Sequence, residues 1–424
     1  MEYLISWLGT SDPVVLGIAA TAIIFGFYMA WNIGANDVAN AMATSVGSGS
    51  LTYRQAIWIA AAMELAGAVL AGSHVTNTIR KGMIDVQLFA HDPQTLMLGM
   101  LAALLAAAVW LNIATLFGLP VSTTHSIVGA IVGFGLFIYG STAIQWIKVF
   151  QIVLSWIISP LAGALIAYFL FVLIRKTILT ARNTSRALLR LTPIFAGLTI
   201  LLIVLATVYK GLKNLNLQLD TSTALFSSLT AGIIGAGIFY LYVSRRDGSR
   251  YDEIQNVERV FMVLQVATAA YVAFAHGAND VANAIGPMAA VFAIIQNGVI
   301  ALKVPVPMWI LLMGGVGIVI GLATWGYRVI KTVGKSITEL TPTRGFSAEF
   351  SCATVVLVCS KLGLPVSTTH TLVGAVVGVG LAQGLGSVNL GVMRSIIASW
   401  LLTLPVAGGL TILIYLGLEA VIQL

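Results

Sequence analysis

The sequence predicts an all-α protein that crosses a membrane many times and is built from two repeats of opposite orientation. Hydrophobic residues make up 58% of its 424 residues and charged residues only 9%, which is too little charge for a water-soluble surface. Apolar runs long enough to span a bilayer recur along the whole chain. A segment of the first half also returns almost unchanged in the second half, which indicates an internal duplication.

The apolar runs predict about twelve transmembrane helices, some of them interrupted. The clearest runs are 14–33, 56–73, 96–117, 149–174, 194–209, 308–326 and 396–416. The first run has no basic leader and no A-x-A cleavage signal, so we expect a retained helix and not a signal peptide. Cys352 and Cys359 lie about 10 Å apart along one expected helix, so we expect them to be inert core residues that form no disulfide.

Two motifs define the duplication. The stretch GLPVSTTHSIVGAIVGFGL at 118–136 returns as GLPVSTTHTLVGAVVGVGL at 363–381, and GANDVANA at 34–41 returns at 277–284. The offsets are 245 and 243 residues, so the spacing between the motifs is nearly the same in both halves. We therefore expect a transmembrane repeat 1 at 14–175, two connecting transmembrane helices with basic loops at 176–259, and a transmembrane repeat 2 at 260–418.

Loop charges predict the orientation of the two repeats. Residues 175–190 carry five basic residues and no acid, and residues 244–259 carry four basic residues among four acids. Because basic residues collect in cytoplasmic loops, both segments are expected inside the cell. Five spans in each repeat then place both termini outside the plasma membrane and make repeat 2 inverted relative to repeat 1. Inverted repeats of this kind are typical of secondary transporters, whose site at the repeat interface opens to each side in turn.

The GANDVANA motif places carboxylate and amide groups inside apolar helices. Its polar residues are Asn36, Asp37 and Asn40 in the first copy and Asn279, Asp280 and Asn283 in the second. Hard cations such as sodium take oxygen ligands of this kind, and Gly34 or Gly277 would allow the helix to open and offer carbonyl oxygens. Neither motif contains Lys or Arg, so we expect the acids to lack a basic partner. The alternative is that the asparagines only support helix packing.

The PVSTTH motif predicts the start of a helix rich in hydrogen-bond donors. Pro120 and Pro365 set the first turn, and the hydroxyl residues are Ser122, Thr123 and Thr124 in one copy and Ser367, Thr368 and Thr369 in the other. A helix N-terminus attracts anions, so two inverted copies would clamp one tetrahedral oxyanion from opposite sides. The alternative is that the hydroxyls only cap a broken helix.

Three histidines lie close to these motifs. His125 and His370 would be able to touch the anion, although we favour a hydrogen bond within the helix turn. His276 precedes only the second GANDVANA copy, with Ile33 at the corresponding position of the first, and is the weaker candidate for that reason.

The paired GANDVANA and PVSTTH motifs resemble those of the inorganic phosphate transporter (PiT) family, over nearly the whole chain. The resemblance implies a secondary transporter that couples phosphate to sodium or protons, works as a homodimer and needs no cofactor beyond the transported ions. It also implies functional roles for Asp37, Asp280, Ser122 and Ser367. Two further family acids correspond to Glu64 and Glu349, which lie within otherwise apolar runs.

Several alternatives remain open at this point. An enzyme is disfavoured because Ser122 and His125 share one helical turn and no GxSxG elbow is present. A passive channel is disfavoured by the inverted repeats with broken helices. Among substrates, sulfate, arsenate or a metal phosphate complex would compete with phosphate, and protons would compete with sodium. We favour sodium because amides ligate metals but carry no proton. No basic patch suits nucleic acid, and the net charge of +7 lies in the loops.

Overall fold

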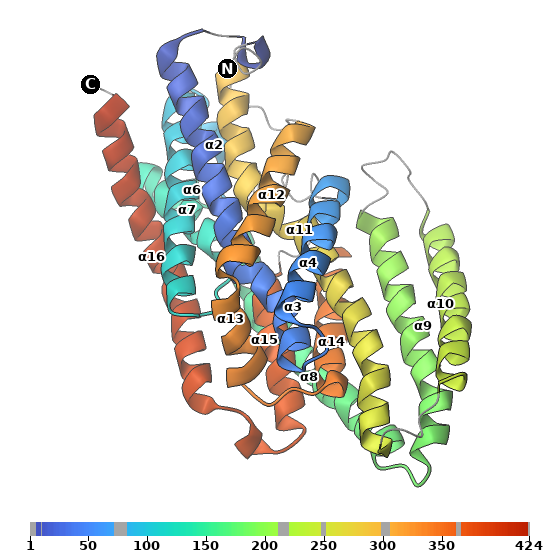
Figure 1. The fold of residues 1–424 in the computed structure, drawn as a ribbon. Helices are drawn as coiled ribbons and strands as arrows, with labels where there is room; N and C mark the ends of the chain where they lie inside the picture. Colours follow the sequence, from blue (N-terminus) through green and yellow to red (C-terminus); the bar gives the residue numbers. More distant parts are fainter. Residues whose placement is uncertain are drawn as a thin grey trace.

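The computed structural model describes residues 6–9, 11–71, 83–210, 220–246, 252–297, 306–361 and 366–422. Apart from one isolated bridge between Ile84 and Ile144, the regular secondary structure of these residues is helical (Figure 1). Pro365, which is expected to set the first turn of a helix, and residues 211–219, within the expected pair of connecting helices, lie outside the described residues.

Along the chain, the helices form a first half, two connecting helices and a second half. The first half comprises α2 (Pro13–Ile33), η1 (Gly34–Val38), α3 (Ala39–Gly47), α4 (Tyr53–Ala71), η2 (Val86–Phe89), α6 (Pro93–Leu116), α7 (Thr123–Tyr139), η3 (Gly140–Ala143), α8 (Trp146–Ile174) and η4 (Arg175–Leu179). Two helices follow, α9 (Thr184–Lys210) and α10 (Thr221–Ser244). The second half comprises α11 (Glu253–Asn297), α12 (Met308–Trp325), α13 (Tyr327–Lys331), η5 (Thr332–Ser336), α14 (Pro342–Lys361), α15 (Thr368–Leu381), η6 (Leu385–Ser387) and α16 (Leu390–Ile422).

Nine helical segments of the described chain are long and apolar enough to cross a membrane. They confirm the multi-pass, all-α fold class. The apolar helix α15 is shorter, and α4 and α14, which carry Glu64 and Glu349, are not among the nine. The total of about twelve spans therefore stays a prediction.

Glycines bring helices of the two halves into direct backbone contact. A Cβ on Gly34 would lie 1.8 Å from the carbonyl oxygen of Ile318 in α12, and a Cβ on Gly277 would lie 2.2 Å from that of Glu64 in α4. Only glycine permits so close an approach. Gly34 and Gly277 are the equivalent first residues of GANDVANA, so the α2–α12 contact is repeated as the α11–α4 contact.

The same kind of reciprocal contact between the two halves occurs elsewhere in the bundle. A Cβ on Gly321 would meet the carbonyl oxygen of Trp31, and a Cβ on Gly67 would meet the carbonyl oxygen of Phe274. Phe274 follows Trp31 by 243 residues, which is the offset between the two GANDVANA copies. The pairs α7–α16 and α8–α15 also pack extensively, and each joins a PVSTTH helix of one half to the long helix of the other. These reciprocal contacts are those expected of two related repeats, and the inverted relation itself stays a prediction.

Figure 1 shows the N- and C-termini at one end of the bundle and the turn between α8 and α9 at the other. This turn lies within the basic segment 175–190. The arrangement agrees with the predicted orientation, in which both termini lie on the side opposite the basic loops. The side of the membrane that each end faces stays a prediction.

Candidate functional site

The first GANDVANA copy interrupts its helix, whereas the second does not. Residues Gly34–Val38 form a π-helical turn between α2 and α3, and this turn carries Asp37. The second copy continues without a break through α11. The expectation that Gly277 opens the helix was therefore wrong. Gly277 instead allows α11 to approach the backbone of α4 at Glu64.

Both motif acids are buried where the GANDVANA and PVSTTH segments meet. Asp37 and Asp280 are only 2% and 4% exposed. Thr123 donates its hydroxyl to Asp37 Oδ2 at 2.6 Å, and Thr369 donates its hydroxyl to Asp37 Oδ1. Asp37 thus accepts hydroxyls from the first turns of both PVSTTH helices.

Asp280 has the corresponding pair of partners. Thr124 donates its hydroxyl to Oδ1 and Thr368 donates its hydroxyl to Oδ2, both at 3.4 Å. Each acid therefore accepts from the first threonine of its own half and the second threonine of the other half. Neither half of the chain forms this cluster alone.

The motif serines cap the helices that follow them. Ser122 Oγ accepts the backbone N–H of His125 at 3.3 Å, and Ser367 Oγ accepts that of His370 at 3.1 Å. Because a capping hydroxyl accepts through its oxygen, its proton remains available for another acceptor. The capping geometry is therefore compatible with either interpretation of these serines.

The motif asparagines differ in what they contact. Asn36 braces the connection between α6 and α7, since its Nδ2 donates to Thr115 Oγ1 at 2.9 Å and its Oδ1 accepts the N–H of Val121 at 3.0 Å. Asn40 Nδ2 donates to Thr369 Oγ1 at 3.0 Å, and its buried Oδ1 has no donor among the described residues.

In the second copy, Asn283 Nδ2 donates to Asp280 Oδ1 at 3.1 Å and to Thr123 Oγ1 at 3.0 Å. Asn279 is partly buried next to Asp280 in α11. The amide groups that face the acid cluster most directly are therefore those of Asn40 and Asn283.

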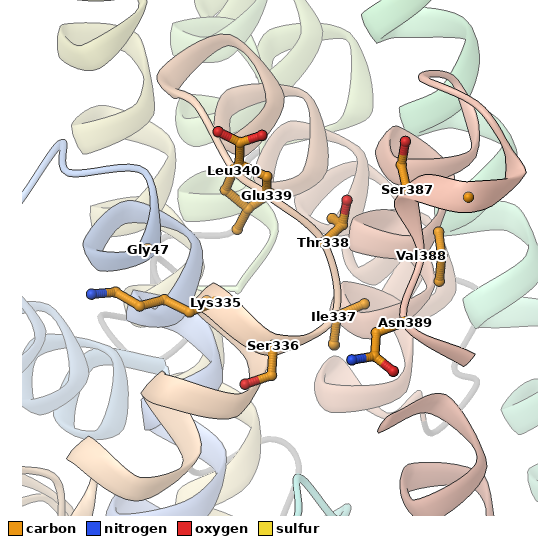
Figure 2. Close-up of a pocket in the computed structure, with 12 residues that line it drawn as sticks. Gly47, Lys335, Ser336, Ile337, Thr338, Glu339, Leu340, Ser387, Val388 and Asn389 are labelled. Carbon is orange, nitrogen blue, oxygen red and sulfur yellow. The ribbon is translucent and has the colours of Figure 1, made fainter. Parts of the chain in front are cut away.

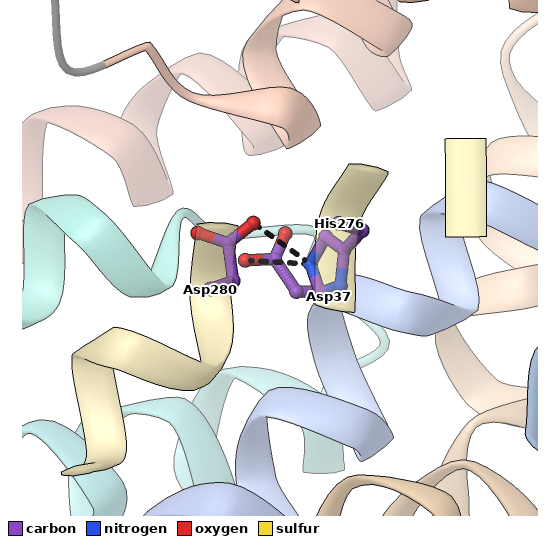
Figure 3. Close-up of side chains that lie close together, drawn as sticks. All are labelled: Asp37, His276 and Asp280. Carbon is purple, nitrogen blue, oxygen red and sulfur yellow. Dashed lines mark ion pairs between the residues drawn. The ribbon is translucent and has the colours of Figure 1, made fainter. Parts of the chain in front are cut away.

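His276 contacts both acids, as the dashed lines in Figure 3 mark. Its Nε2 is 3.1 Å from Asp280 Oδ2 and 3.6 Å from Asp37 Oδ2. One ligand atom each of Asp37, His276 and Asp280 lies within 4.8 Å of the others, which is compact enough to hold a metal ion. The expectation that the acids lack a basic partner was therefore wrong, and the ranking of His276 as a weak candidate missed a central side chain.

Glu64 is the second partner of this histidine. His276 Nδ1 lies 3.1 Å from its carboxylate, and both side chains are 1% exposed. The reciprocal glycine contacts make Ile318 the counterpart of Glu64, as Ile33 is the counterpart of His276. One of the two equivalent contacts between the halves thus holds a hydrogen-bonded polar pair, where the other contact holds two isoleucines. The polar residues Glu64 and His276, which correspond to isoleucines in the other copy, were the feature of the sequence that indicated this pair.

Glu349 forms a separate polar cluster between α3, α11 and α14. Its carboxylate accepts the hydroxyls of Thr44, of Ser45 at 2.7 Å and of Thr268 at 2.6 Å, and the amide of Gln265 at 3.5 Å. All five residues are buried. These donors explain how a carboxylate is accommodated inside an apolar bundle.

His125 and His370 meet edge to face in the first turns of the two PVSTTH helices. Their ring centroids are 4.2 Å apart, and the rings pack on Trp156 and Trp400 at 3.5 and 3.6 Å. The expected hydrogen bond within the helix turn is made by each histidine's backbone N–H, not by its ring. The two rings hold the helix starts against each other, one turn from the acid cluster.

Comparison with known proteins identifies the family. Residues 33–411 match the model of the phosphate transporter family. The chain belongs to this family. It is 50% identical over 407 residues to a protein of Pyrococcus abyssi named as a phosphate permease, covering 95% of this chain and 98% of that protein. It is 44% identical over 430 residues to inorganic phosphate transporter 2-1 of Arabidopsis thaliana, covering 93% of this chain and 71% of that protein.

A solved structure agrees with the fold. The structure described as the sodium-dependent phosphate transporter is similar to this chain with a TM-score of 0.88 and 44% sequence identity, covering 95% of this chain and 99% of that one. The family resemblance inferred from GANDVANA and PVSTTH is confirmed. Membership places this multi-pass membrane protein among phosphate transporters.

Proposed function

We propose that this protein is a secondary active transporter that imports inorganic phosphate by cation-coupled symport, with sodium as the coupling ion. The observation that carries the proposal is the reciprocal bonding of Asp37 and Asp280 to threonines of both halves. A central site built equally from two repeats is the arrangement that alternating access requires, because movement of one repeat against the other exposes it to either side.

The hydroxyl groups of the PVSTTH turns would bind the phosphate. The proposed set is Ser122, Thr123, Thr124, Ser367, Thr368 and Thr369, together with the two aspartates. The threonines now donate to the carboxylates, so a cation that engages the carboxylates would free these hydroxyls to donate to an anion. Cation binding would in this way prepare the phosphate site, which couples the two ligands.

The carboxylates also favour phosphate over sulfate. A protonated phosphate oxygen donates a hydrogen bond to Asp37 or Asp280, whereas sulfate carries no proton at neutral pH. Bound sulfate would leave the buried carboxylate oxygens without this hydrogen-bond donor. The cost of leaving buried acceptors unpaired therefore disfavours sulfate.

Sodium is supported by a specific oxygen atom. Asn40 Oδ1 is buried, lacks a donor in the described part of the chain, and belongs to an amide whose nitrogen is 3.5 Å from Asp37 Oδ1. An amide oxygen beside a carboxylate is a ligand set for a hard cation. The proposed cation ligands are Asn36, Asp37, Asn40, Asn279, Asp280 and Asn283. His276, a titratable side chain whose Nε2 lies close to both acids, favours proton coupling as the second candidate.

Radiolabelled phosphate uptake into liposomes tests the proposal, with sodium and proton gradients imposed separately. Uptake driven by an inward sodium gradient at equal pH on both sides is the expected result. Uptake that ignores the replacement of sodium by potassium but follows a pH gradient would establish the proton alternative. Flux that needs neither gradient and does not saturate would indicate a channel.

A further inference from the structure

Helix α3 carries polar side chains from the acid cluster towards one end of the bundle. Asp37, Asn40, Thr44 and Ser48 are three or four positions apart, which places them on one helix face. Thr44 donates to Glu349, and Ser48 donates to Gln265 at 2.8 Å. At the usual rise per residue, this polar stripe extends about 15 Å beyond Asp37.

The equivalent face of α11 is apolar. The positions that correspond to Thr44, Ser45 and Ser48 are Pro287, Met288 and Val291, all buried. This part of α11 leads towards the terminal end of the bundle, where Gln296 donates to the carbonyl of Trp7. Of the two equivalent helix faces, only that of α3 offers polar groups beyond the central site.

A pocket of about 620 Å³ lies where α3 ends, at Gly47. Figure 2 shows it surrounded by the η5 turn, the segment after it and the residues that precede α16. Its polar lining comprises Lys335, Ser336, Thr338, Glu339, Ser387 and Asn389. The pocket therefore lies at the end of the polar stripe, at the end of the bundle that carries basic loops.

Two residues of this lining have polar groups with no partner among the described residues. The hydroxyl of Thr338 is buried and has no hydrogen-bond partner among the described residues. Lys335 is exposed and has no carboxylate within ion-pair distance in that part of the chain, because Glu339 pairs with Arg344 at 3.8 Å. Both residues line the same pocket, and an ammonium and a hydroxyl are groups that bind oxyanions.

We propose that this pocket is the inner mouth of the transport route, and that Lys335 and Thr338 form a transient binding site for free phosphate on its way between the central site and the cytoplasm. The inference rests on the proposed phosphate transport and adds a second phosphate site to it. Phosphate released from the acid cluster would follow the α3 stripe and meet the first free positive charge at Lys335.

Transport measured from each side of the membrane tests this site. Vesicles are sorted by protease cleavage of an external C-terminal tag, and the half-saturating phosphate concentration is measured with phosphate on the pocket side and on the opposite side. Lys335→Gln and Thr338→Val should raise the pocket-side value about two- to fivefold, and more than the opposite-side value. Lys331→Gln is the matched control, since Lys331 is exposed at the same end but does not line the pocket.

Three results would overturn the proposal: equal changes on both sides, no change in either variant, or the same pocket-side rise in Lys331→Gln. Repeating the assay in neutral phosphatidylcholine vesicles and in vesicles with added phosphatidylglycerol separates free phosphate from a lipid headgroup, because a rise confined to anionic vesicles would contradict a site for free phosphate. If the unchanged protein transports no phosphate from either side, the proposed function is wrong. If it transports phosphate and the variants behave like the unchanged protein, the proposed function stands and only the second phosphate site is wrong.

Discussion

Thr369 donates its hydroxyl to Asp37, although 332 residues separate the two in the chain. Thr124 makes the corresponding bond to Asp280 across 156 residues. Each bond crosses between the halves, so a movement of one half against the other must break or remake both. The bonds within each half, from Thr123 to Asp37 and from Thr368 to Asp280, would survive such a movement.

The acids are the first target for mutation. We expect Asp37→Asn or Asp280→Asn to abolish sodium-dependent phosphate uptake while the protein still inserts, because an amide removes the charge that balances a cation. Asp220→Asn is the control, since Asp220 is an exposed N-cap of α10 and Asn caps equally well. Uptake into proteoliposomes at matched protein content is the measurement, and normal uptake in either site variant would remove the cation site.

The pair of Glu64 and His276 should behave as a unit. Removing one partner of a buried pair leaves the other uncompensated and costs about 3–5 kcal/mol of stability. We therefore expect Glu64→Gln and His276→Gln each to lower the melting temperature and uptake, and the double variant to lose less than the sum of the two. Glu253→Gln controls for charge removal, because Glu253 is an exposed acid at the start of α11, the helix that carries His276. Additive losses would show that the two side chains act independently.

The sequence predicted the parts of the site that occur twice. Duplication of GANDVANA and PVSTTH singled out both acids and the threonines that they contact. Polar groups are costly inside apolar helices, so a polar pattern that occurs twice indicates a functional role. The repeat alone does not reveal which half a side chain faces. That Thr124 bonds Asp280 instead of Asp37 follows from the packing of α7 against α11, and no local pattern encodes it.

The features that occur once were harder to predict. His276 was ranked low because Ile33 occupies its counterpart, yet this asymmetry places one basic group within contact distance of both acids. Its partner Glu64 lies 212 residues away, beyond the reach of any spacing argument. The Gly277 prediction failed for a related reason: the sequence shows that a glycine is needed, but not whether the need is an open helix or a close neighbour.

The close helix contacts give a prediction of stability. Gly277→Ala places a methyl group against the Glu64 carbonyl and must push α11 away from α4, which should cost about 1–3 kcal/mol. Gly409→Ala in α16 meets no atom within 4 Å and should be neutral or slightly stabilising, because alanine favours a helix. Melting temperatures of the two purified variants provide the comparison. Equal values would mean that the two helices separate at no cost.

The serines decide between an anion clamp and simple capping. If each PVSTTH turn supplies a hydroxyl to one phosphate, Ser122→Ala or Ser367→Ala leaves the opposite turn intact, so binding weakens without vanishing. A hydrogen bond to a charged group is worth about 1.5–3 kcal/mol, so each variant should lose affinity on the order of tenfold to a hundredfold.

The double variant extends this test, because both serines would hold the same ligand and their losses need not add. A role in capping alone predicts a lower melting temperature with unchanged phosphate affinity per folded molecule, since the hydroxyls would then stabilise only α7 and α15 through the N–H groups of His125 and His370. Calorimetric phosphate binding and melting temperatures on the same purified variants separate the two roles. Ser126→Ala is the control, because Ser126 is buried in α7 but donates to the carbonyl of Ser122 within its own helix. Unchanged affinity in both site variants would leave the serines as caps and assign the anion to the threonines and backbone donors.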